Sequence, residues 1–181
     1  MFKHILIGLF SAFLAFFTYV AMKPAAFNVS RSTVIAAAPS AVYPHIASFK
    51  KWQAWSPWAK KDPAAKASYS GPESGVGATF EWSGNSEVGE GAMAIVDAKT
   101  DERVGIKLTF TKPMAGSSDV LLTLRPEGQG TSVTWAIAGQ NGFVARAFMM
   151  LFGYDMEKMI GDEYAKGLAN LKAVVEGAPK S

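Results

Sequence analysis

The sequence contains no cysteine and only two histidines among its 181 residues. The lack of cysteine excludes disulfide scaffolds, cysteine nucleophiles, iron–sulfur clusters and thiolate zinc sites. Two histidines are too few for a histidine-rich metal centre. The sequence therefore predicts neither a metal site nor a cofactor, and it favours binding over catalysis.

Charged side chains are also scarce, since they make up 18% of the chain against roughly 25% in an average soluble domain. Hydrophobic residues reach 49%, so the chain can bury enough apolar surface to offset the entropy lost on ordering. This composition excludes a mainly disordered protein. The length is that of one domain, or of one domain with a short addition.

Part of the apolar excess lies at the N-terminus, where residues 5–22 form an uncharged run of about the length that spans a bilayer. Lys3 precedes the run and Lys23 follows it. A cleaved signal peptide and a buried core helix share this composition, although small residues suited to a cleavage site are poorly placed. We expect residues 1–23 to be a transmembrane anchor, with these side chains in the bilayer: Ile5, Leu9, Phe13, Phe17 and Val20.

The anchor predicts a single-pass membrane protein. Positive charges are nearly balanced across the span, so the charge rule for orientation decides little. We expect the domain on the extracytoplasmic side, as for most short N-terminal anchors. Residues 24–177 then form one globular domain, and residues 178–181 form a tail.

The domain begins as a strand over residues 27–37, where apolar and polar residues alternate. Two short helices follow the strand, and the first starts at Pro39 and is limited by Pro44. Turn residues then separate six further strands, which predicts an antiparallel meander; the strands are 67–69, 78–83, 89–98, 103–111, 118–125 and 131–138. From residue 143 the apolar period becomes helical as far as Gly177, with Asn141 as the expected cap and glycines at 153, 161 and 167 as possible bends.

This order predicts an α+β fold in which a curved antiparallel sheet wraps around a long C-terminal helix. A sheet with one apolar face needs a cover, and the last helix is the only element large enough. We expect a cavity between the helix and the sheet.

Several short motifs in this order resemble the START-like (SRPBCC, polyketide cyclase/dehydrase type) helix-grip domains, over residues 27 to about 175. They are Arg31-Ser32 with Ile35, the stretch from Ala38 to Tyr43, Trp52-x-x-Trp55-Ser56-Pro57-Trp58, Gly71-Pro72, Gly75-x-Gly77-x-x-x-x-Trp82, Gly130-Thr131-x-Val133-Thr134-Trp135 and Gly167-Leu168-x-x-Leu171-Lys172. The resemblance implies the helix-grip fold. It does not specify a function, because members include lipid carriers, cyclases, hormone binders and chaperone cofactors.

The candidate ligand-binding residues are aromatic side chains and methionines expected to line or gate the cavity. The alternative, which these residue types favour, is that the tryptophans plug one end of the core and that the methionines, which adapt to irregular gaps, are core residues. The set is Trp52, Trp55, Trp82, Met93, Phe110, Trp135, Phe148, Phe152, Met156 and Met159.

Titratable candidates for acid–base chemistry are few: Asp155, Glu87, Glu90 and His45. Glu81 precedes Trp82 on one strand, so an inward Trp82 places Glu81 outward. Lysines 50, 51, 60 and 61 form the only basic cluster, for which a solvated surface or contact with lipid headgroups is favoured over nucleic acid.

The leading hypothesis is a membrane-tethered domain that binds a small hydrophobic or amphipathic ligand, such as a lipid. An enzyme of the cyclase/dehydrase type and a non-enzymatic interaction module with a filled core are the alternatives.

Overall fold

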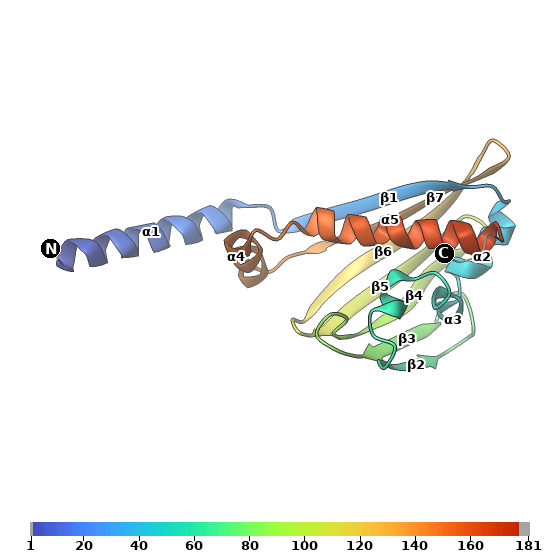
Figure 1. Cartoon of the computed structure of the whole chain (residues 1–181), viewed down its shortest axis with the longest axis horizontal. Helices are drawn as coiled ribbons and strands as arrows, with labels where there is room; N and C mark the ends of the chain where they lie inside the picture. The colour runs from blue at the N-terminus through green and yellow to red at the C-terminus, as the bar shows by residue number, and fades with distance from the viewer. Residues whose placement is uncertain (1, 178–181) are drawn as a thin grey trace.

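The computed structural model describes residues 2–177, so the expected tail at 178–181 lies outside the described residues. Figure 1 shows a curved sheet with one long helix lying along it and another helix extending away from the domain. The elements are α1 (Phe2–Met22), β1 (Ala26–Ile35), α2 (Pro39–Ile46), α3 (Phe49–Trp52), the 3-10 helix η1 (Pro57–Lys60), β2 (Lys66–Ser70), β3 (Thr79–Ser83), β4 (Glu90–Lys99), β5 (Arg103–Lys112), β6 (Gly116–Glu127), β7 (Gly130–Gln140), α4 (Phe143–Phe152) and α5 (Met156–Val175).

The seven strands form one antiparallel sheet in the order β1-β7-β6-β5-β4-β3-β2. Every neighbouring pair apart from β1 and β7 is also consecutive in sequence, as the predicted meander requires, and β1 closes the sheet against the last strand. The helix-grip α+β prediction is confirmed.

Helix α5 covers the inner face of the sheet at β1 and β7 (Figure 1). On that face the ring of Tyr164 from α5 stacks on Trp135 of β7, with centroids 4.0 Å apart. Gly167 permits this approach, because a Cβ atom there would lie 2.6 Å from the Trp135 ring. At the other end of α5, Arg31 of β1 donates a hydrogen bond of 2.8 Å to Glu157.

The helical stripe after residue 143 is not one helix, which corrects the expectation of a continuous element. Gly153 ends α4 in the left-handed region, with φ of 68°, a conformation that costs glycine little. The N-cap of α4 is Gly142, without a side-chain hydrogen bond, so Asn141 is not the cap. The side-chain amide of Asn141 instead lies 3.6 Å from the sulfur of Met156.

Helix α1 is long and apolar enough to cross a membrane, by length and composition, and it lies near the N-terminus, as a signal sequence also does. Of the five predicted anchor residues, Ile5, Leu9 and Phe13 are 58–64% exposed and Phe17 is partly buried. Val20 is buried, because the end of α1 packs against α4.

Candidate ligand-binding groove

The residues on the inner face of the sheet can be identified from the buried Trp135 and the pairing of residues across the strands. One row opposite Trp135 contains Leu122 of β6 and Val104 of β5. Because alternate residues share a face, the row four positions further along β7 also points inward. That row runs through Ser118, Leu108, Met93, Phe80 and Tyr69, and the next contains Phe110, Gly91 and Trp82.

One half of this inner face is filled by aromatic rings. Trp52, Trp55 and Trp58 each pack edge-on against Trp135, with centroids 5.2–5.9 Å apart. Trp52, Trp55 and Trp135 are all at most 4% exposed. The tryptophan motif from residues 52 to 58 therefore closes the space between α5 and the sheet. The predicted site residues Trp52, Trp55 and Trp135 lie in a packed core.

Short irregular segments hold these tryptophans in place. Helix α3 ends at Trp52, and η1 begins at Pro57, the first helical position, where the fixed φ angle of proline is favourable. The indole of Trp52 donates to the carbonyl of Ile46, and that of Trp55 to the carbonyl of His45. The Nε1 atom of Trp135 is buried without a hydrogen-bond partner.

The other half of the inner face remains open. Tyr69 contacts Phe80 and Phe80 contacts Trp82, at centroid distances of 5.1 and 5.7 Å, and Trp82 packs edge-on against Phe110 at 5.6 Å. Phe110 is 36% exposed and Tyr69 38%, while Met93 is partly buried. We call this partly exposed surface, made of Tyr69, Phe80, Trp82, Met93, Leu108 and Phe110, the aromatic groove; of the two hollows described below, only the smaller one touches it, at Tyr69.

The four remaining predicted site residues lie on the two C-terminal helices. Met156 is partly buried, with its sulfur 3.6 Å from the side-chain amide of Asn141. Met159 is 55% exposed, so it does not line an enclosed cavity. Phe148 and Phe152 were expected on the same cavity-lining stripe. The break at Gly153 separates them from it, and they pack on one another on α4, 48% and 61% exposed.

The titratable residues named as acid–base candidates lie in structural contacts or at the surface. Glu90 accepts hydrogen bonds from Lys112 and Ser83, and these bonds lower the pKa of its carboxyl group. Glu87 is exposed. Burial, together with the charge of Lys51, lowers the pKa of His45. No group of three histidine or acidic side chains that could hold a metal ion occurs among residues 2–177.

Asp155 is the N-cap of α5, since its carboxylate accepts from the backbone N–H of Lys158 at 3.0 Å. We expect Asp155→Ala to lower the free energy of unfolding by about 1 kcal/mol, the usual loss for a helix cap. Chemical denaturation of the full chain in detergent measures this loss. Asp155→Ser supplies another capping oxygen and should restore most of it. Equal losses in the two variants would contradict a capping role.

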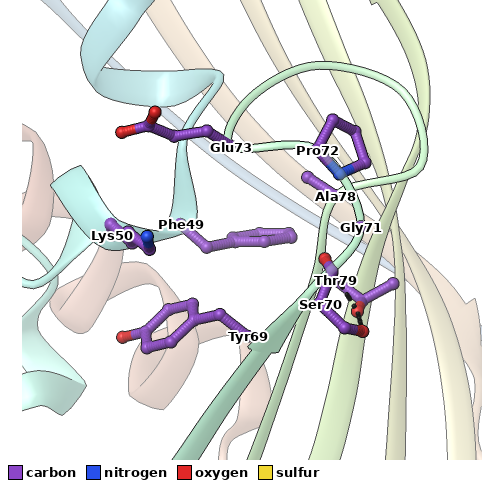
Figure 2. A pocket seen from close by; sticks show the side chains of 9 residues that line it. All are labelled: Phe49, Lys50, Tyr69, Ser70, Gly71, Pro72, Glu73, Ala78 and Thr79. Atoms are coloured by element: carbon purple, nitrogen blue, oxygen red, sulfur yellow. Dashed lines mark hydrogen bonds between the residues drawn. The ribbon is translucent and has the colours of Figure 1, made fainter.

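A small pocket lies where α3 meets the turn between β2 and β3. Figure 2 shows the Phe49 ring pointing into it, with Tyr69 and Lys50 on one side and the Ser70–Thr79 pair on the other. Its volume is about 160 Å³, below the roughly 300 Å³ at which ligand pockets begin. A shallow hollow of about 650 Å³ lies elsewhere, over the start of β1 and the end of β7.

A family profile and a set of solved structures resemble this chain. A family profile described as "Polyketide cyclase / dehydrase and lipid transport" matches residues 26–176, which includes every strand, α4 and α5. No curated protein matches the chain.

Solved structures share the same architecture at low identity. The Aha1 dimer from Colwellia psychrerythraea is 16% identical with a TM-score of 0.60, over 85% of this chain and 99% of that one. Protein MLL2253 from Mesorhizobium loti is 13% identical with a TM-score of 0.61, over 85% and 100%. CalU16 from Micromonospora echinospora is 17% identical with a TM-score of 0.56, over 86% and 78%. At this identity the likeness establishes the fold alone.

Proposed function

The chain belongs to the polyketide cyclase/dehydrase and lipid transport family, and from this membership we propose that it binds a small hydrophobic or amphipathic ligand, such as a lipid, in the aromatic groove. The observation that carries the proposal is the row of inward-facing aromatic rings that α5 leaves uncovered. Partly exposed apolar surface of this kind favours an apolar ligand, because covering it removes it from water.

The groove is suited to binding rather than to acid–base catalysis. Its inner residues are aromatic or aliphatic. Of the carboxylates named above, Asp155 caps α5, Glu90 is held by Lys112 and Glu87 is exposed. A general acid or base must instead reach the substrate with a pKa near the working pH. The tryptophan cluster supports a filled core in one half of the domain only, so it is compatible with a ligand in the other half.

We further propose that α1 tethers the domain to a membrane as a single span, with residues 24–177 on the extracytoplasmic side. The support is the length and apolar composition of α1 and the exposure of nearly all its side chains. Water would disfavour such a surface, whereas a bilayer would cover it.

Photocrosslinking tests ligand binding in the full chain. The protein, reconstituted in lipid nanodiscs, is incubated with a fatty acid that carries a diazirine, irradiated and digested. We expect adducts on peptides from β3 and β5, in addition to adducts on α1 from ligand dissolved in the bilayer. An excess of unmodified fatty acid should suppress the first set and leave the second. Adducts on α1 alone would overturn the proposed groove and leave the tether standing.

A further inference from the structure

Helix α4 has a largely exposed apolar face, on which the only ring contact from outside the helix is that of Tyr154 with Phe148, at 5.7 Å, among residues 2–177. Its ten residues read FVARAFMMLF, with one charge at Arg146, and none of them is buried. The side chains of Val144, Phe148, Leu151 and Phe152 lie at helical spacings of three and four, so they share one face. They are 48–72% exposed.

Helix α4 lies beside the end of α1 (Figure 1), and the contacts between them come from its opposite face. The Phe143 ring stacks on Phe17 of α1 at 5.5 Å. The Arg146 guanidinium donates to the carbonyl of Val20 at 3.3 Å and to that of Lys23. A cation that binds the last carbonyls of a helix is stabilised by the helix dipole, so Arg146 holds α4 against the C-terminal end of α1.

The depth of α4 relative to a bilayer follows from this contact. The 21 residues of α1 measure roughly 32 Å along the helix axis, close to the ~30 Å of a hydrocarbon core. Lys23 folds over the Tyr19 ring, 4.7 Å from its centroid, a pair typical of the membrane interface. The carbonyls that Arg146 binds therefore lie at the boundary of the bilayer.

We propose that α4 lies in the plane of the membrane interface, with its apolar face in the same bilayer that α1 crosses. The proposal rests on the proposed tether. The occupant of the face is lipid, because the apolar surface continues from the end of α1 and the only charge on α4 is turned to the α1 carbonyls. A helix that lies in the interface plane is held there by the apolar area that its one face buries at the boundary of headgroups and acyl chains.

This position has a consequence for the groove. Strand β1 begins and β7 ends beside α4 and, because neighbouring strands are antiparallel, the turn between β5 and β6 lies at the same end of the sheet (Figure 1). Met114 in that turn is 53% exposed. Phe110 is close to the end of β5, next to this turn, and therefore lies at the end of the groove nearest the bilayer. An apolar ligand that enters there from the bilayer has a shorter path through water.

Spin labels can measure the depth directly, because the chain has no cysteine of its own. Full-length Leu151→Cys, Phe10→Cys and Val96→Cys variants are labelled with a nitroxide and reconstituted in phosphatidylcholine–phosphatidylglycerol vesicles. Collisions with oxygen report lipid, and collisions with a water-soluble nickel chelate report solvent. Phe10 lies mid-way along α1, and Val96 is 58% exposed on β4.

We expect a severalfold higher oxygen-to-nickel collision ratio at Leu151 than at Val96, with Phe10 deepest. A label at Leu151 as open to nickel as that at Val96, with Phe10 still in lipid, would overturn the docking of α4 and leave the tether intact. A label at Leu151 shielded from both reagents would assign the face to a second copy of the chain and overturn lipid docking. Nickel access at Phe10 would overturn the tether and the docking together.

Discussion

Replacing Trp135 by alanine is expected to lower the free energy of unfolding by about 3–5 kcal/mol, the range for truncating a buried aromatic side chain. The residue is 2% exposed. It stacks on Tyr164 of α5 and receives the edges of three other indoles, so its loss leaves a cavity that several rings share. Guanidinium unfolding of the full chain in detergent, followed by tyrosine and tryptophan near-ultraviolet circular dichroism, measures the change.

The matched control is Trp135→Phe. The Trp135 Nε1 atom has no hydrogen-bond partner, so this change removes ring volume without removing a hydrogen bond. It should cost much less than the alanine variant. An alanine variant within about 0.5 kcal/mol of the parent, the range of ordinary surface substitutions, would contradict a packed core at this end of the domain.

Much of the fold could be predicted because each strand carries its own pattern. Alternation in residues 103–111 and 131–138 placed Ile106 and Trp135 inside, and both are buried. Glu81 and Trp82 were predicted on opposite faces, and Glu81 is exposed while Trp82 is partly buried. These are local effects of a two-residue period, so they need no knowledge of distant contacts.

The division of the inner face could not be predicted, since it depends on where α5 lies across the sheet. Trp55 and Trp82 were both candidate cavity residues by residue type, yet Trp55 is enclosed beside Trp135 and Trp82 remains in the open half. Likewise, the apolar stripe continues through Gly153, and only its left-handed conformation turns Phe148 and Phe152 onto a separate helix. Asp155 was a catalytic candidate because of its residue type. Its role as a helix cap could be recognised only once the structure showed that α5 begins at Met156.

Replacing Phe110 by glutamate is expected to reduce ligand crosslinking on β3 and β5 by at least about tenfold, which corresponds to 1.4 kcal/mol of binding free energy. Phe110 packs edge-on against Trp82 and is 36% exposed. A carboxylate can stay hydrated there in the unliganded protein but loses water when an apolar ligand covers it, and burial of an unpaired charge is costly. Crosslinking in nanodiscs with the diazirine fatty acid provides the measurement.

Val96→Glu is the matched control, because it adds the same charge to the same sheet at a residue that is 58% exposed beside the inward-facing Ile95. It should leave crosslinking on β3 and β5 unchanged. Adducts on α1 serve as an internal standard in both variants, since ligand in the bilayer reaches them without entering the groove. Phe110→Leu keeps an apolar side chain and should retain most of the crosslinking, which separates an effect of charge from an effect of shape. If glutamate at position 110 left the groove adducts undiminished relative to α1, the ligand would not lie against Phe110, and the open aromatic row would be a surface of the fold rather than its binding site.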